Sequence, residues 1–136
     1  MANQIQMVMY EGYLAEDPEM RFTPSGKPVT NFRMGSTRQY KDAQGETVKE
    51  TTWLKVTAWN KLGEIVNNYC GKGSHVIVTG ILRGNESGNP SVYTRNNGEA
   101  GASFEITASE VRILKAKDGA FANRQSETLS DDELPF

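Results

Sequence analysis

The alternation of apolar and polar residues marks five segments of the chain as β-strands. Successive side chains of a strand point to opposite faces, so an apolar residue at every second position indicates a strand with one buried face. In the fourth segment both faces are apolar, which indicates packing against another element or subunit. The segments are residues 7–14, 29–37, 52–59, 75–83 and 103–114.

Two interruptions of this alternation carry structural meaning. Gly12 breaks the pattern of the first strand, as a bulge or a point of close packing does. After Ala108 the last strand resumes its alternation one position out of step, which predicts a β-bulge near Ser109 and Glu110.

Residues 61–69 have helical periodicity instead. Their apolar residues recur at i, i+3, i+4 and i+7, the spacing of an amphipathic helix, and Gly71 and Gly73 end it. Such a helix suits the plug at one end of a barrel. The apolar positions are Leu62, Ile65, Val66 and Tyr69.

Polar segments separate these elements. Residues 39–50 are typical of an exposed hairpin loop or a long β-arm. Residues 84–101 are rich in Gly, Asn and Ser around Pro90, which predicts a long flexible loop. Beyond Lys115 the composition turns polar, so we expect one folded domain at residues 1–115 and a disordered linker and tip at residues 116–136.

Five strands with a helix between the third and the fourth are the layout of the OB-fold, a five-stranded Greek-key barrel. We therefore predict an all-β fold of this class with one short helix. OB-folds handle oligonucleotides and oligosaccharides, but a fold alone does not define a function.

Composition excludes several classes of site. The 136 residues include one Cys and one His, which excludes a disulfide framework and a Cys/His zinc site, and we expect no metal and no cofactor. A lone His75 on a strand favours a structural role. The single Cys fits a reducing, cytoplasmic setting. No apolar run approaches the roughly 20 residues of a membrane span, and no signal peptide is recognisable, so no membrane partner is expected.

Charge is distributed unevenly along the chain. Up to Lys115 there are 13 Lys and Arg against 12 Asp and Glu, and beyond it there are 2 against 5. Taken alone, the formal net charge of −2 argues against a nucleic-acid partner, because phosphate contacts require clustered cations. Since the acidity lies in the tail, the argument does not apply to the domain.

Two tryptophans share one face of the third strand with a lysine. Alternation places Trp53, Lys55 and Trp59 together, with the two indoles about 20 Å apart at about 3.3 Å per residue. Aromatic rings stack on any base while cations follow the phosphates, a combination typical of single-strand binding with little sequence preference. The alternative is that both tryptophans belong to the core.

Further aromatic and basic residues extend this candidate site. Tyr40 at the base of the polar arm and Tyr93 in the predicted loop are either stacking residues or simple loop anchors. Scattered cations are usually a solvated surface, but beside stacking rings they become contacts to the DNA backbone. The candidate cations are Arg33, Arg38, Lys41, Lys55, Lys61, Lys72, Arg83 and Arg95.

The C-terminal tip combines acidic residues with a terminal apolar group. A ring that fills a pocket, a proline that limits the entropy lost on binding and charges that seek a basic rim form a compact protein ligand. The alternative is an acidic tail that only aids solubility. The residues are Asp131, Asp132, Glu133, Leu134, Pro135 and Phe136.

The sequence resembles the bacterial and phage single-stranded DNA-binding proteins over nearly its whole length. The acidic tip is similar to the family's tip ending in Pro-Phe. The other motifs are Gly12-Tyr13-Leu14, Asp17-Pro18-Glu19-Met20-Arg21, Ser25-Gly26, Val29-Thr30-Asn31-Phe32, Glu50-Thr51-Thr52-Trp53, Lys61-Leu62-Gly63-Glu64 and Lys72-Gly73-Ser74 with Gly80.

This resemblance assigns roles to several positions. It implies that Trp53 matches a base-stacking Trp, that Trp59 lies where the family has a stacking aromatic, and that Tyr40 and Tyr93 lie where other members have an aromatic residue. It also implies that three lysines follow the DNA path, although the segment after Arg83 departs from the family's more basic run. The lysines are Lys55, Lys61 and Lys72.

The resemblance further implies a homotetramer, which agrees with the doubly apolar fourth strand and with Met7, Met9 and Tyr13 on the outer face of the first strand. We expect a non-enzymatic, cytoplasmic, nucleoid-associated protein that protects single-stranded DNA and recruits replication, recombination and repair proteins through its tip.

Two other classes of function stay open at this point. One is an accessory module whose OB-fold mainly binds protein. The other is an enzyme such as a nuclease, although the sequence contains no recognisable catalytic cluster.

Overall fold

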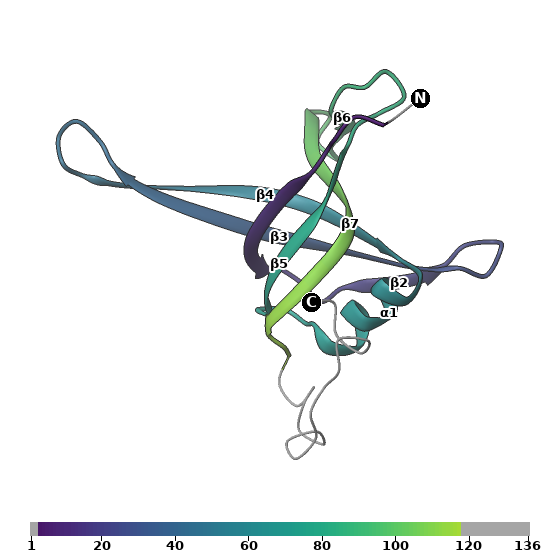
Figure 1. Ribbon diagram of the computed structural model, residues 1–136. Helices are drawn as coiled ribbons and strands as arrows, with labels where there is room; N and C mark the ends of the chain where they lie inside the picture. Colours follow the sequence, from purple (N-terminus) through teal and green to yellow (C-terminus); the bar gives the residue numbers. More distant parts are fainter. Residues whose placement is uncertain (1–2, 118–136) are drawn as a thin grey trace, which may run out of the picture.

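Residues 3–117, which the computed structural model describes, form seven strands and one helix (Figure 1). The prediction of a mostly β fold with one helix between long strands is confirmed. In chain order the elements are β1 (Val8–Leu14), β2 (Glu19–Phe22), β3 (Pro28–Lys41), β4 (Thr47–Trp59), α1 (Asn60–Tyr69), β5 (His75–Arg83), β6 (Ser91–Thr94) and β7 (Ala100–Lys115).

Five of the strands close into a barrel in the order β1, β5, β7, β4, β3. Most neighbours are antiparallel, but β4 and β7 run parallel. The ring closes where β1 meets β3, through only two register pairs, Tyr13 with Gly35 and Leu14 with Met34. This closed barrel with one helix confirms the predicted OB-fold.

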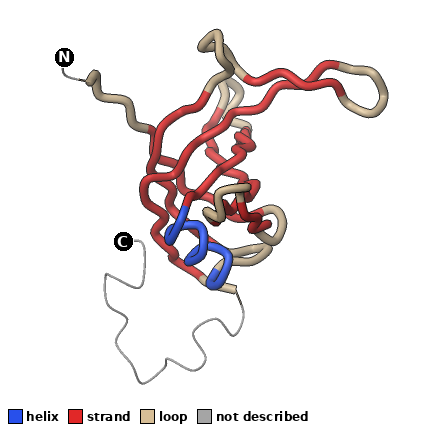
Figure 2. The backbone as a smooth tube through the Cα atoms, turned by 90° about the vertical axis from the view of Figure 1, so that its right-hand side faces the viewer, coloured by secondary structure: helices blue, strands red, loops and turns tan. Residues whose placement is uncertain are grey.

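The barrel interior is filled by the alternate apolar residues of these strands, including Met34, Leu54, Val56, Val78 and Ile106, all of which are almost fully buried. Helix α1 lies across one end of the barrel (Figure 2). The predicted amphipathic pattern is confirmed, because Val66 is buried and Leu62, Ile65 and Tyr69 pack against the core. The buried hydroxyl of Thr30 donates a hydrogen bond of 2.7 Å to the carbonyl oxygen of Gly63, which fixes the helix to β3.

The two predicted irregularities are also confirmed. In the pairing of β5 with β7, Thr79 faces Glu110 and Gly80 faces Ala108, so Ser109 is the extra residue of a bulge. At Gly12, a Cβ atom would lie 2.3 Å from the carbonyl oxygen of Gly35, so only glycine permits the contact that closes the barrel.

The segment between β3 and β4 is a long β-arm. The two strands stay paired from Val29 and Trp59 to Lys41 and Thr47, far beyond the barrel, and project to one side of it (Figure 1). A carboxylate oxygen of Asp42 accepts the backbone N–H groups of Gln44 and Glu46 and so closes the turn. Of the two predicted alternatives, hairpin loop and arm, the arm is correct.

Two short strands were not predicted from the sequence. β2 pairs with β3, and β6 pairs with the start of β7, so residues 84–101 are not one continuous flexible loop as predicted. Each has only four residues, too few to show a period, and glycine and asparagine on both sides of β6 hide its β-prone residues. The tight turn from Arg95 to Glu99 closes the β6–β7 hairpin with a backbone hydrogen bond of 2.7 Å.

The boundary predicted between folded domain and tail stays a prediction, because residues 118–136 lie outside the described residues. Within residues 3–117 no helix has the length and apolar character needed to cross a membrane.

Cys70, the chain's only cysteine, follows α1 and is 1% exposed. Burial raises the pKa of its thiol from 9.0 to about 12, against a weaker opposing effect of the Lys117 charge. The native protein therefore keeps the thiol protonated where the unfolded chain would lose the proton.

This difference predicts a pH dependence of stability. Above pH 9 the unfolded chain binds fewer protons than the native protein, so the free energy of unfolding should fall with rising pH, by roughly 1 kcal/mol per pH unit from this residue. Urea unfolding of the wild type and Cys70→Ala between pH 8 and pH 10.5 should show the extra slope only in the wild type. Equal slopes in the two proteins would contradict it.

Candidate nucleic-acid interface

Strand β4 separates core residues from candidate site residues by alternation. Leu54, Val56 and Ala58 are buried, whereas Trp53 and Trp59 are 47% and 42% exposed. Lys55 lies between them on the same outer face and is also exposed. The alternative that both tryptophans belong to the core is therefore wrong.

The position of the Trp53 ring depends on its neighbours on β3. Gly35 is its register partner, and a Cβ atom there would lie 2.8 Å from Cζ3 of the indole. The absence of a side chain lets the ring pack directly on the β3 backbone. The guanidinium of Arg33 lies over the ring, 4.3 Å from its centroid, in a cation–π contact.

A groove of about 860 Å³ joins this surface to the β6–β7 hairpin. Trp53 and Lys55 line it from β4, and Tyr93 and Arg95 line it from the hairpin. Tyr93 is positioned in the same way as Trp53: its ring packs on a glycine, Gly101, which is its register partner. The fold thus brings together two aromatic rings that lie 40 positions apart in the sequence.

A row of charges crosses the sheet at the level of Lys55. Register pairs place Arg33, Lys55, Glu105 and Arg83 side by side on β3, β4, β7 and β5. Among residues 3–117, no ion pair involves any of these three cations. The row therefore offers three cations to an anionic chain, with a single carboxylate among them.

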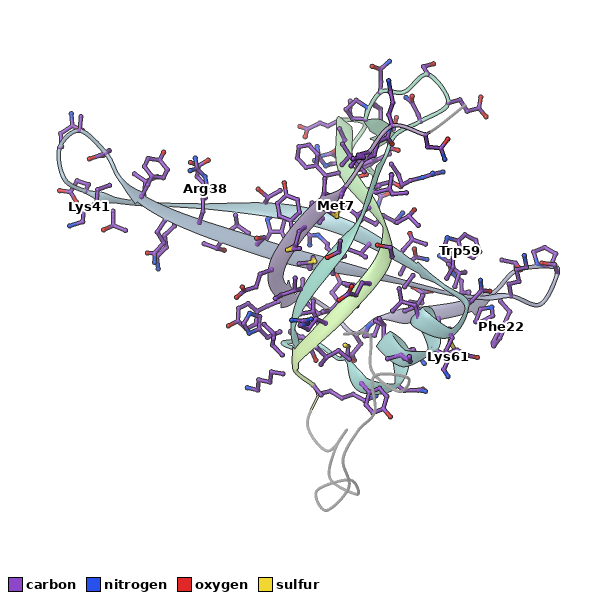
Figure 3. The ribbon with its side chains drawn as sticks, viewed as in Figure 1. Met7, Phe22, Arg38, Lys41, Trp59 and Lys61 are labelled. Carbon is purple, nitrogen blue, oxygen red and sulfur yellow. The ribbon has the colours of Figure 1, made fainter. Side chains whose placement is uncertain are left out.

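Tyr40 and Arg38 lie apart from this groove. Both point to the face of the β-arm opposite Trp53, because each is an odd number of positions from Gly35. Arg38 stacks on Tyr40 at 4.9 Å and forms an ion pair of 2.9 Å with Glu50. Lys41 lies further along the same arm (Figure 3).

The other end of β4 carries a second group. Trp59 lies near Lys61, in the first turn of α1 (Figure 3). Trp59 pairs with Val29 of β3, and Val29 pairs in turn with Arg21 of β2. Arg21 is an exposed cation that was not predicted as a site residue from the sequence. Only its place on the unpredicted strand β2 gives Arg21 this position.

Lys72 does not line the groove, whereas Phe104 does. The backbone N–H of Lys72 donates to a carboxylate oxygen of Asp17, a groove residue, at 2.8 Å. Phe104 alternates with Ile106 and Ala108 as a core residue would, yet it lines the groove and is 56% exposed. At Phe104, β7 has left the barrel, so a side chain on the face that points inward elsewhere in the strand no longer meets the hydrophobic core.

Among residues 3–117 no group of three His, Cys, Asp or Glu residues could hold a metal ion. His75 interacts with Glu11 at 2.8 Å through Nε2 and stacks on Tyr13 at 4.3 Å, which agrees with a structural role. Which of the candidate residues touch DNA stays a prediction.

Comparison with known sequences gives consistent matches. The model of the single-strand binding protein family matches residues 3–114. A single-stranded DNA-binding protein 1 of Chlorobaculum tepidum is 34% identical over 118 residues, which are 87% of this chain and 70% of the relative. A single-stranded DNA-binding protein of Xanthomonas campestris pv. campestris is 35% identical over 114 residues, 84% of this chain. The chain spans 63% of that relative, less than two thirds of its length.

Solved structures match as well. A small single-stranded DNA-binding protein from Streptomyces coelicolor superposes with a TM-score of 0.66 at 25% identity, over 82% of this chain and 95% of the other. A Plasmodium falciparum SSB in complex with ssDNA shares the fold, with a TM-score of 0.68 at 19% identity, over 85% and 99% of the two chains. The chain therefore belongs to the single-strand binding protein family, whose members are non-enzymatic DNA-binding proteins.

Proposed function

We propose that this protein binds single-stranded DNA without sequence specificity. The observation that carries the proposal is the groove in which half-exposed Trp53 and Tyr93 lie beside Arg33 and Lys55. The names of its relatives support the same ligand, since they are single-stranded DNA-binding proteins.

Binding combines base stacking with phosphate contacts. Each stacked base contributes about 1 to 3 kcal/mol and every base has a π-face, so stacking is tolerant of sequence. Cations release the counterions of the phosphates, which makes affinity depend on salt. The proposed contact residues are Tyr40, Trp53, Trp59, Tyr93, Arg33, Arg38, Lys41, Lys55, Lys61, Lys72, Arg83 and Arg95.

The β-arm constrains the path of the strand. Trp53 and Tyr40 lie on opposite faces of the arm. A strand that stacks on both rings has to pass over an edge of the arm, so the DNA bends around the protein instead of crossing a flat surface.

Partner recruitment is assigned to the C-terminal tip. Residues 131–136 lie outside the described residues, and their acidic and apolar composition supports binding to replication, recombination and repair proteins. A DNA ligand places the proposed site of action at the nucleoid, and a single cysteine fits the reducing cytoplasm.

A homotetramer is proposed from the outer surface of β1. Met7, Met9 and Tyr13 are 66%, 63% and 55% exposed there, an unusual apolar surface for a monomer. On the edge of β1 that faces β3, only Tyr13 and Leu14 have register partners, so residues 8–11 have no register partner there in the described chain. Both features support contact with a second copy.

If Trp53 and Trp59 stack on bases, the double variant Trp53→Ala/Trp59→Ala should bind single-stranded DNA much more weakly than the wild type. Each change should cost about 1 to 3 kcal/mol, roughly 5- to 150-fold in Kd. Fluorescence anisotropy of a labelled oligothymidylate measures it, with Phe22→Ala as the control, because Phe22 is an aromatic of β2 that is even more exposed than the two tryptophans. Unchanged affinity in the double variant would refute stacking. Competition by duplex DNA would instead favour a different class of ligand.

Deletion of residues 131–136 separates the two proposed activities. Binding of partner proteins should be lost in pull-down experiments, while affinity for oligothymidylate persists or increases because six residues with three carboxylates are removed. Loss of DNA binding in the shortened protein would show that the division between barrel and tip is wrong.

The assembly proposal predicts a mass in solution of four times 15.1 kDa. Met9→Glu should lower that mass, because a charge on the outer face of β1 would be buried without a partner. Light scattering after size-exclusion chromatography measures it, and Phe22→Glu serves as a control on a distant exposed apolar residue. A monomeric wild type would exclude the assembly.

A further inference from the structure

Each of three proposed stacking rings carries an arginine. Arg33 lies over Trp53 at 4.3 Å, Arg38 over Tyr40 at 4.9 Å, and Arg95 over Tyr93 at 5.7 Å. A guanidinium is flat and stacks on aromatic faces much as a base does. Without DNA, arginines therefore already occupy positions that bases would take.

The three guanidiniums differ in what else holds them. Arg38 is fixed by its ion pair with Glu50, and Arg95 donates a hydrogen bond of 3.0 Å to the carbonyl oxygen of Ala100. Within residues 3–117, the Arg33 side chain has no hydrogen bond or ion pair, so the contact with Trp53 alone holds its guanidinium. Arg33 is thus the guanidinium that can leave its ring at the lowest cost.

The surroundings of Trp53 restrict where a base can stack on the indole. One part of the indole packs on Gly35 and is closed to a ligand. The guanidinium of Arg33 lies over the ring. A base that stacks there has to take the place of the guanidinium.

We propose that Arg33 is an exchanging residue: it leaves Trp53 when a base stacks on the indole, and it then binds a phosphate of the same strand. The proposal rests on the proposed function. Base stacking on an aromatic ring is stronger than an exposed cation–π contact, so the exchange favours the base. Arg33 stands in the row with Lys55 and Arg83, where a released guanidinium can bind a phosphate through two donors.

This exchange would contribute to the choice of ligand. Single-stranded DNA supplies an unpaired base for the indole together with a phosphate for the guanidinium. Duplex DNA offers phosphates but keeps its bases stacked inside, so it cannot replace the guanidinium on the ring. Arg33 therefore adds more to affinity for a single strand than for a duplex.

NMR spectroscopy of the full-length protein with oligothymidylate observes the exchange directly. The δ-protons of Arg33 should be shifted upfield by the indole in the free protein and should return toward ordinary values in the complex. Those of Arg38 should keep their shift, because Glu50 holds the guanidinium on one face of Tyr40 and a base then stacks on the other face. Glu50→Gln should make the Arg38 protons move as well. An upfield position of the Arg33 protons that persists in the bound state would overturn the exchange.

The salt dependence of binding supplies a second measurement. Arg33→Met should lower the slope of log K against log salt by about 0.7, the value for one phosphate contact with a single strand. Lys27→Met removes an exposed cation outside the site and serves as the control. A wild-type slope in Arg33→Met would overturn the phosphate contact. Absence of binding by the unchanged protein would overturn the proposed function itself, whereas normal binding with an unmoved Arg33 overturns only the exchange.

Discussion

The barrel and the candidate interface both depend on the pairing of β3 with β4. Thirteen register pairs hold the two strands together, from Val29 with Trp59 to Lys41 with Thr47. One face of this ribbon supplies Met34, Leu54 and Val56 to the core, and the other face carries the half-exposed indole of Trp53. A slip of one residue would exchange the two faces, so the register that fills the core also presents the aromatic surface.

Features encoded by neighbouring residues could be predicted from the sequence. The alternation along residues 52–59 separated Leu54 from Trp53, the spacing of residues 61–69 indicated α1, and a break in alternation located the extra residue Ser109. Each of these signals is local, because it reflects the period of a single element. The net charge of the chain was a poor guide, since a row of cations needs only a few residues at the right register.

Features that depend on pairing between distant segments could not be predicted. Tyr93 reaches the groove because β6 pairs with β7, and Tyr40 faces away from Trp53 because of the register of the β-arm. Phe104 has the alternation of a core residue, yet it lies where β7 has already left the barrel. In each case the local sequence is compatible with either outcome, and tertiary contacts decide between them.

The β-arm and the β6–β7 hairpin both project from the ring of paired strands that closes the barrel. The arm tip at residues 42–46 and the turn from Arg95 to Glu99 contribute no backbone hydrogen bond to the paired barrel strands. Insertions and deletions at such positions leave the core intact and are readily tolerated. Evolution can therefore lengthen or shorten the projections of this scaffold, and so change how much ligand one subunit covers, while the barrel itself stays under the constraint of its packing.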